Sequence, residues 1–307
     1  MSSPAPAVPI RPGSVDAWAI AMRPRTLWIA TVPVFVGTAL AWLERGAIDW
    51  TVAALALIGS LLMQIISNLQ NDVGYSQRGA ESSARIGMPR ATSTGLLTAQ
   101  QVRLAIVLAV IASMAVGLPL VLRGGWPVLA MGLGSIVAAL AYMGGPKPIA
   151  YTPLGELTVF IFFGVIAVAG SGYVQIGTIT PATWAAATGV GLLAAAVLAV
   201  NNHRDIAHDA RTGRRTFAVT FGAEASRQLF TLLVLGAFAL VPLAAWFAQS
   251  AALLIPLIAL PGAWRVVQTI RSPANGGALS NLLLRTVKLE LLFGVLFAIG
   301  AIGAGWR

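Results

Sequence analysis

Cysteine is absent from the sequence, histidine occurs twice, and charged residues are few. The absence of cysteine excludes a disulfide framework, a thiolate metal site and a thiol nucleophile. His203 and His208 cannot build a histidine-rich metal centre by themselves, so any metal site needs carboxylates. Asp, Glu, Lys and Arg make up 10% of the chain, against about 25% of an ordinary soluble domain. This scarcity of charge argues against a soluble protein.

Apolar residues are abundant and occur in long runs. They make up 57% of the 307 residues, and the mean hydropathy is +0.82. The runs hold about 18 to 22 residues, and a helix needs about 20 to cross the hydrocarbon core of a bilayer. A membrane β-barrel would alternate polar and apolar residues, which Leu192–Val200 does not. The sequence therefore predicts an all-α integral membrane protein with about nine transmembrane helices, at Leu27–Leu43, Val52–Leu69, Leu104–Leu122, Val128–Met143, Leu157–Tyr173, Trp184–Val200, Leu229–Phe247, Ala251–Val267 and Leu289–Ala304.

The basic residues predict how these helices are oriented. Of the 20 Lys and Arg residues, 17 fall in loops on one side of the predicted bundle, and only Arg45, Arg123 and Arg307 fall on the other. Because cytoplasmic loops carry the excess of Lys and Arg, the N-terminus is predicted in the cytoplasm and the protein in the inner (cytoplasmic) membrane. The same rule accounts for the net charge of +10, so no nucleic-acid partner is expected.

The sequence is predicted to divide into a short N-terminal tail and one domain. Residues 1–13 are rich in proline and small residues and are predicted to form a disordered tail. Residues 14–307 are predicted to form a single transmembrane domain, with cytoplasmic cap loops at about 70–100 and 201–226. Eight of the ten acidic residues, Glu156 and Glu290 among them, are expected on the cytoplasmic side. Acidic residues contribute little to topology, so their crowding on one side indicates a site.

Two similar motifs end the second and sixth predicted helices. Asn68 precedes Asp72 by four residues, and Asn201 precedes Asp205 in the same way, 133 residues later. The arrangement resembles a parallel internal repeat whose two copies face a shared site. Residues four apart stack on one helix face, so Asn201, Asp205 and Asp209 are expected to form one stripe on the sixth helix.

Amide and carboxylate oxygens are ligands that suit Mg²⁺, which is usually held together with substrate phosphates and water. The spacing therefore predicts Mg²⁺ ligands at Asn68, Asp72, Asp205 and Asp209. Cations from the neighbouring loops would bind a diphosphate, since the arginine fork matches phosphate oxygens. The candidates for substrate binding are Asn68, Arg78, Arg85, Tyr142, Lys147, Asn202 and Arg214. Helix capping, lipid headgroup contacts and an interfacial role for Tyr142 are the alternatives.

These motifs resemble those of the UbiA superfamily of intramembrane prenyltransferases. The strings that carry the resemblance are R-P-R-T-L, N-D-V-G-Y, D-I-A-H-D, G-G-P-K-P and T-G-R-R-T-F-A-V-T-F-G, at Arg23–Leu27, Asn71–Tyr75, Asp205–Asp209, Gly144–Pro148 and Thr212–Gly222. The resemblance extends over nearly the whole chain, from Met22 through the ninth helix. It implies a helical bundle around a lipid-open cavity, capped by polar loops, in which Mg²⁺ bridges to a prenyl diphosphate.

Within the superfamily the chain is most similar to the menaquinone branch. The resemblance implies Mg²⁺-dependent transfer of a polyprenyl group from an allylic diphosphate to 1,4-dihydroxy-2-naphthoate, with loss of carbon dioxide, at the cytoplasmic face. It assigns catalytic roles to Asp72, Asp205, Asp209 and Lys147. One departure stands out, because Tyr75 occupies the place of the second Asp of the first motif. Glu81 likewise stands where a later Asp is common.

Other functions remain open on the sequence. The alternative within the enzyme class is an enzyme whose acceptor is 4-hydroxybenzoate or another phenol instead of the naphthoate. A membrane transporter is an alternative of another class, although transporter sites lie near the midplane and carry ionisable groups inside the spans. A non-catalytic quinone-binding protein is the third alternative, for which Tyr75 would mark the loss of activity.

Overall fold

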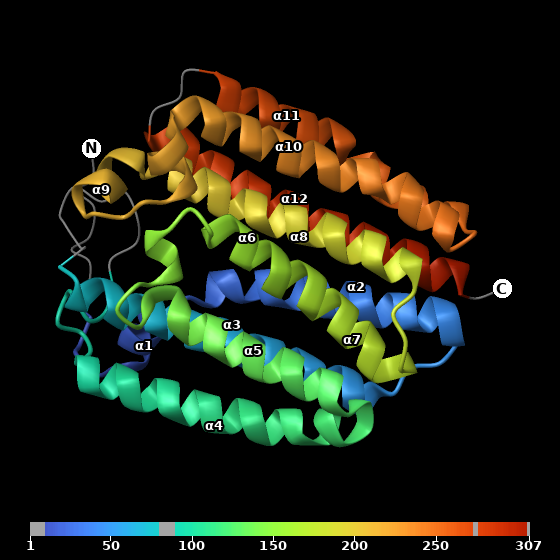
Figure 1. The fold of residues 1–307 in the computed structure, drawn as a ribbon, viewed down its shortest axis with the longest axis horizontal. Helices are drawn as coiled ribbons and strands as arrows, with labels where there is room; N and C mark the ends of the chain where they lie inside the picture. Colours follow the sequence, from blue (N-terminus) through green and yellow to red (C-terminus); the bar gives the residue numbers. More distant parts are fainter. Residues whose placement is uncertain (1–9, 80–89, 273–275, 306–307) are drawn as a thin grey trace, which may run out of the picture.

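The computed structural model describes residues 10–79, 90–272 and 276–305 (Figure 1). The described residues are almost entirely helical and contain no β-strand. The elements are α1 (Val15–Met22), α2 (Leu27–Arg45), α3 (Trp50–Gln77), α4 (Ala99–Gly124), α5 (Trp126–Met143), α6 (Gly155–Val159), a π-helical segment (Phe160–Ile166), α7 (Ala167–Ile176), α8 (Pro181–Arg204), α9 (Ile206–Arg211), α10 (Phe217–Phe247), a 3₁₀ segment (Ala251–Ala259), α11 (Leu260–Arg271) and α12 (Gly276–Ala304).

Within these ranges, nine helical segments are long and apolar enough to cross a membrane, which confirms the predicted number. All of them extend beyond the predicted bounds, and three do so by ten residues or more, because α3 continues to Gln77, α10 begins at Phe217 and α12 begins at Gly276. These three contain 28, 31 and 29 residues. At about 1.5 Å per residue such helices exceed the roughly 30 Å hydrocarbon core. Their polar ends therefore extend beyond it.

The early start of α12 places Glu290 well inside the helix, 14 residues after Gly276, where its side chain is buried. The predicted span began only one residue before it. The position of Glu290 on the cytoplasmic side stays a prediction. The predicted boundary was wrong because Arg285 and Lys288 interrupt the apolar run, although helix α12 continues through both residues. Long basic side chains can extend along a helix toward the interface while their backbone remains in the span.

Local sequence explains several helix ends. The Asp49 side chain accepts a hydrogen bond from the Val52 amide at the start of α3. Thr98 and Gln101 form a capping box at the start of α4. Gly46 and Gly177 end α2 and α7 in the left-handed conformation, which glycine adopts without a Cβ penalty.

The helices form two packed groups (Figure 1). In the figure α3, α4 and α5 lie together along one side, and α10 and α11 lie along the other. The larger hydrophobic core joins α2, α7 and α8 to α10, α11 and α12. A second core joins α1, α3 and α4. The helix α8 is buried along most of its length, because small residues such as Ala187, Ala195 and Ala199 allow its neighbours to approach closely.

The fifth span is interrupted by the π-helical segment Phe160–Ile166, consistent with the glycines that loosen this stretch of sequence. Here the span crosses α8 at very short range. A Cβ added to Gly164 would overlap the backbone of Gly191, and a Cβ added to Gly191 would approach the Phe160 carbonyl oxygen at 2.7 Å. Glycine at both positions therefore sets the distance between the two spans.

Replacing Gly164 by alanine is expected to lower the melting temperature in detergent. Overpacking a tight contact costs about 1–3 kcal/mol of unfolding free energy. The matched control is Gly303→Ala, because Gly303 is also helical and an added Cβ there would meet nothing within 4 Å. Thermal unfolding of both variants checks the prediction, and equal melting temperatures would contradict it.

Four polar residues close the bundle at the end where α2 turns into α3. Arg123 forms an ion pair of 2.9 Å with Asp49 and donates to the Val174 carbonyl at 2.8 Å. Gln175 exchanges two hydrogen bonds of 3.0 Å with the Asp49 backbone. Arg45 donates to the Gln175 carbonyl at 3.1 Å. We call Arg45, Asp49, Arg123 and Gln175 the Asp49 clasp; it ties α2, α3, α4 and α7 together.

Candidate active site

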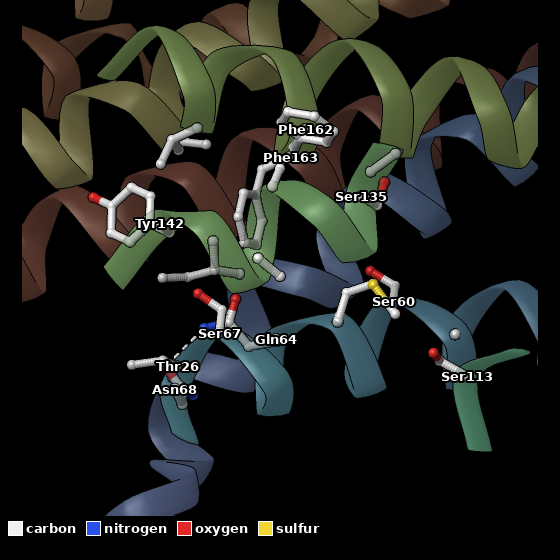
Figure 2. A pocket seen from close by; sticks show the side chains of 18 of the residues that line it. Thr26, Ser60, Gln64, Ser67, Asn68, Ser113, Ser135, Tyr142, Phe162 and Phe163 are labelled. Atoms are coloured by element: carbon white, nitrogen blue, oxygen red, sulfur yellow. Dashed lines mark hydrogen bonds between the residues drawn. The ribbon is translucent and has the colours of Figure 1, made fainter. Parts of the chain in front are cut away.

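A cavity of about 1270 Å³ lies between the two groups of helices. Its volume exceeds the roughly 300–1,000 Å³ typical of small-molecule pockets, and its lining is mostly apolar. Figure 2 shows Phe162 and Phe163 on one wall, and Gln64 and Asn68 on the opposite wall. The cavity therefore suits a ligand that is largely hydrocarbon.

One end of the cavity is polar. We define the polar end as the six polar residues that line the cavity where α3 and α8 finish: Asn71, Tyr75, Arg90, Asn201, Arg204 and Arg214. Three of these residues are arginines, so this end attracts anions. Sequence reasoning selected only Arg214 from this set as a substrate-binding residue, although Asn71 and Asn201 both belong to the predicted motifs. The residue types were evident in the motifs, but the face on which each residue lies was not.

Two aspartates lie behind these arginines. Asp209 forms a buried ion pair of 2.7 Å with Arg214, and Asp205 forms one of 2.8 Å with Arg204. Asp205 accepts from Arg204 with both carboxylate oxygens, whereas the Oδ2 atom of Asp209 is buried without a hydrogen-bond partner. Burial raises the pKa of Asp209, and the neighbouring Arg214 partly offsets this increase. An unpartnered buried oxygen is costly unless a ligand binds it.

The predicted stripe on one helix is interrupted. The helix α8 ends at Arg204, and Asp205 lies between it and α9 with φ −96° and ψ 9°. Hydrogen bonds four residues apart continue across the break, from the Asp205 amide to Asn201 at 3.2 Å and from the Asp209 amide to Asp205 at 2.8 Å. The structure thus brings Asp205 and Asp209 to the same place, through two helices instead of one.

Tyr75 lies between two guanidinium groups. The Arg90 guanidinium carbon is 3.7 Å from the centre of the Tyr75 ring, and that of Arg214 is 5.2 Å from it. Both distances allow cation–π attraction. The aromatic side chain therefore holds the two arginines near each other without adding a negative charge.

Asn68, in the first motif, forms hydrogen bonds with other residues of the protein. Asn68 donates to the Met22 carbonyl at 2.7 Å and to the Thr26 hydroxyl at 2.9 Å (Figure 2). Its amide oxygen accepts from Gln64 at 3.1 Å. These bonds fix the start of α2 against α3. Asn68 lines the cavity, but its amide is already engaged.

Asp72 is fully buried and holds the loop that precedes α4. Its carboxylate accepts from the Ala91 amide at 2.8 Å, the Thr92 amide at 2.9 Å and the Thr92 hydroxyl at 2.6 Å. A carboxylate has about four lone-pair sites, so these bonds occupy most of them. Its role as a metal ligand stays a prediction.

The remaining predicted residues are spread around the polar end. Arg78 donates to the carbonyls of Met143 at 2.8 Å and Gly145 at 2.6 Å, and so fixes the loop after α5. Lys147 is exposed on that loop. Tyr142 lines the cavity, as Figure 2 shows. Arg85 and Glu81 lie outside the described residues.

Asn202 does not line the cavity. It donates to the Glu156 carboxylate at 3.0 Å, and both residues are buried between α6 and α8. Sequence reasoning placed Glu156 among the cytoplasmic acids without assigning it a partner. The Asn202 amide oxygen and the second Glu156 oxygen are buried without hydrogen-bond partners.

The donors at the polar end fit a hard divalent cation of the kind predicted. Among the described residues no group of three or more His, Asp or Glu side chains gathers as a closed metal cage. Mg²⁺ does not need such a cage, since one or two carboxylates plus substrate phosphates and water usually hold it. The Asn71 amide in the lining and the unpartnered Asp209 oxygen behind it supply ligands of this type, whereas the Asn201 amide oxygen accepts from Arg204 at 2.9 Å.

Comparison with known proteins agrees with this geometry. The 1,4-dihydroxy-2-naphthoate octaprenyltransferase of Escherichia coli (strain K12) is 37% identical over 298 residues, which cover 95% of this chain and 96% of that one. The apo structure of a UbiA homolog from Aeropyrum pernix K1 has a TM-score of 0.70 at 14% identity, covering 89% of this chain and 96% of that chain.

A second solved structure, a UbiA homolog from Archaeoglobus fulgidus bound to DMAPP and Mg²⁺, has a TM-score of 0.67 at 16% identity. It covers 92% of this chain and 99% of that chain. The match to the family itself, described as the UbiA prenyltransferase family, runs over residues 30–283, which is most of the sequence. This chain is therefore a multi-pass membrane protein that belongs to the UbiA prenyltransferase family.

Proposed function

We propose that the protein transfers a polyprenyl group from an allylic diphosphate to 1,4-dihydroxy-2-naphthoate, whose carboxylate leaves as carbon dioxide, in menaquinone biosynthesis. The proposal includes Mg²⁺ as cofactor and an active site at the cytoplasmic face of the inner membrane. The observation that carries it is a long apolar cavity lined by arginines at one end, two of which are paired with buried aspartates behind the lining. A prenyl diphosphate has the same asymmetry, with a charged head and a hydrocarbon tail.

The comparisons support the assignment of substrates. The Escherichia coli relative is named for a naphthoate acceptor and an octaprenyl group. The Archaeoglobus fulgidus homolog was solved with DMAPP and Mg²⁺ bound. An identity of 37% over almost the full length of both chains favours the same reaction here as in the Escherichia coli relative.

At the polar end, Arg90, Arg204 and Arg214 would bind the diphosphate, since arginine presents donors in a fork that matches phosphate oxygens. Asp209 and Asp205, with the amides of Asn71 and Asn201, would hold Mg²⁺. When bound there, Mg²⁺ supplies a Lewis acid that stabilises the charge of the departing diphosphate. Asp72 and Asn68 remain predicted ligands beside them, since Asp72 and Asn68 accept from protein donors as Asp205 does from Arg204.

The reaction breaks the bond between the allylic carbon and the diphosphate oxygen, and forms a carbon–carbon bond to the electron-rich ring. The arginines of the polar end stabilise the charge that develops on the leaving oxygen. Phe162, Phe163 and the other apolar lining residues keep water from the allylic cation. Tyr142 also lines the cavity, where its hydroxyl is placed to contact the diphosphate or the acceptor.

Purified protein in liposomes tests the proposal. It would receive Mg²⁺, octaprenyl diphosphate, and either 1,4-dihydroxy-2-naphthoate or 4-hydroxybenzoate. We expect prenylated naphthol and released carbon dioxide, at a rate at least about tenfold above that with the benzoate, because a site that pairs the acceptor's polar groups rejects analogues that lack them. A chelator should stop the reaction and added Mg²⁺ should restore it.

Each alternative gives a different result. Product from 4-hydroxybenzoate alone would retain the reaction class and replace the acceptor. No product from either acceptor, with diphosphate still bound, would contradict the proposal and favour the non-catalytic alternative. The variant Asp205→Ala serves as the inactive control.

A further inference from the structure

A second pocket lies near the start of α10 and the end of α11. It has a volume of about 380 Å³ and is lined by Glu224, Arg227, Gln228 and Arg271. None of these four residues lines the large cavity. The first three belong to α10 and the last ends α11, and the two helices lie along one side of the bundle (Figure 1). We call this site the α10–α11 pocket.

The α10–α11 pocket lies at the same end of the bundle as the polar end of the cavity. His203, the residue before Arg204, is within electrostatic range of both Arg227 and Glu224. Arg204 lines the cavity, whereas His203 does not. The last turn of α8 therefore separates the two sites. A group bound in the α10–α11 pocket would lie at this end of the bundle but outside the cavity.

Neighbouring side chains hold both arginines of the pocket. Arg227 forms an ion pair of 3.1 Å with Glu224, and the Nε atom of Arg271 donates to the Thr231 hydroxyl at 3.4 Å. The Nε atom of Arg227 is buried, and it has no hydrogen-bond partner among the described residues. Because a guanidinium group carries several N–H donors, each arginine keeps donors for a ligand. The two arginines lie on adjacent helices, so one ligand can contact both.

The charges of the pocket suit one singly charged anion. Arg227 and Arg271 carry two positive charges and Glu224 carries one negative charge, which leaves the pocket with a net charge of +1. The Glu224 side chain is 70% exposed, and such an exposed ion pair contributes little, so Glu224 competes weakly for Arg227. The arginine fork matches phosphate oxygens. A phosphodiester carries a single negative charge and would neutralise the pocket.

Exposed apolar side chains continue from the pocket into the spans. Leu232 follows Gln228 by four residues on α10 and is 70% exposed, and Trp264 precedes Arg271 by seven residues on α11 and is 54% exposed. Residues at these spacings share one helix face. At about 1.5 Å per residue they lie about 6 Å and 10 Å deeper in the bundle than the polar residues. A charged headgroup with hydrocarbon below it is the shape of a phospholipid.

We infer that the α10–α11 pocket binds the headgroup of an anionic phospholipid. The phosphodiester contacts Arg227 and Arg271, which belong to different helices. The acyl chains lie against Leu232 and Trp264 on the outer surface of the bundle. A lipid bound in this way links α10 to α11, and a ligand that binds only the folded protein stabilises it. The site is separate from the proposed reaction and does not depend on it.

The test measures the melting temperature in micelles of a neutral detergent during titration with phosphatidylglycerol. We expect the amount of lipid needed for half of the stabilisation to rise at least about tenfold in Arg227→Gln and in Arg271→Gln, because a hydrogen bond to a charged group is worth about a factor of ten or more. Arg265→Gln is the matched control. It removes the same charge from an exposed position on α11 outside the pocket, and it should change this amount by no more than about threefold.

Two comparisons decide against general effects of charge or of lipid. Non-specific attraction to an anionic surface is similar for every cation near it, so equal losses in all three variants would overturn the inference. An equal stabilisation by phosphatidylcholine, whose headgroup has no net charge, would also overturn it. Inorganic phosphate is the third ligand tested. If it reproduced the stabilisation, the pocket would bind free phosphate, and the lipid would be excluded.

The outcome does not depend on activity. If phosphatidylglycerol did not raise the melting temperature of the unmodified protein, the inference would fail and the proposed function would remain. Arg227 and Arg271 lie on different helices, so misfolding of one variant leaves the other to decide. Should both misfold, native mass spectrometry of the unmodified protein decides, since it should retain phosphatidylglycerol in preference to phosphatidylcholine from an equal mixture.

Discussion

Replacing Asp209 by asparagine is expected to lower kcat/KM for prenyl transfer by at least about 10³-fold. The substitution removes the buried carboxylate that pairs with Arg214 at 2.7 Å and presents an unpartnered oxygen. A Lewis acid bound to it is worth several kcal/mol, and each 1.36 kcal/mol corresponds to a factor of about ten. Steady-state kinetics in liposomes with saturating Mg²⁺ check the result.

The loss must be separated from a loss of folding. Removing one partner of a buried ion pair costs about 3–5 kcal/mol, so the melting temperature of Asp209→Asn should also fall. The matched control is Asp49→Asn, which removes the carboxylate of another arginine pair outside the cavity. Because that pair is partly exposed, its loss should cost about 0.2–1 kcal/mol and leave kcat/KM nearly unchanged. Full activity of a folded Asp209→Asn variant would contradict the proposed site.

Replacing Asp72 by asparagine is the second substitution with a large expected effect. An asparagine would direct its NH₂ group at one of the amide donors of Ala91 and Thr92, which now donate to the carboxylate. Hydrogen bonds to charged groups are worth about 1.5–3 kcal/mol each. The loop that carries Arg90 would detach, and Arg90 would leave the Tyr75 ring. We expect activity to fall at least about 10²-fold, in line with the loss of one preorganised charge contact.

Thr92→Val separates two explanations for such a loss. It removes the 2.6 Å bond from the Thr92 hydroxyl but keeps the Asp72 carboxylate. If Asp72 acts by holding the loop, both variants lose activity and need the same Mg²⁺ concentration for half-maximal rate. If Asp72 binds Mg²⁺ as the sequence predicts, that concentration rises in Asp72→Asn alone. An Asp72→Asn variant of normal activity would exclude both roles.

The spans were predictable from sequence because lipid imposes a strong rule. Only long apolar helices satisfy their backbone in hydrocarbon, so hydropathy located all nine segments found among the described residues. The ends were less predictable. The sequence pattern placed Arg285 and Lys288 in a loop, but helix α12 continues through both residues, and Glu290 on the same helix is buried in the bundle.

The chemical groups of the candidate site were predictable from the sequence, but the positions of these groups relative to one another were less predictable. Asp205 and Asp209 meet as their spacing indicated, and Arg214 joins them. By contrast, the partners of Asp72 come from residues 91 and 92, across a loop whose path no spacing rule predicts. Arg78 shows the same difficulty, since its guanidinium binds backbone carbonyls instead of pointing into the cavity.

The Asp49 clasp bears on the electrical insulation that the membrane provides. The lining of the cavity runs along α3 from Asn71 to Ala56, which is 15 residues or about 22 Å. This hollow occupies much of a hydrocarbon core that is roughly 30 Å thick. Each elementary charge that crossed the membrane would dissipate about 2.3 kcal/mol per 100 mV of membrane potential. The clasp lies at the end where α2 turns into α3, and it pairs the charges of Arg123 and Asp49 there. This end of the bundle thus presents a permeating cation with a paired carboxylate instead of a lone one.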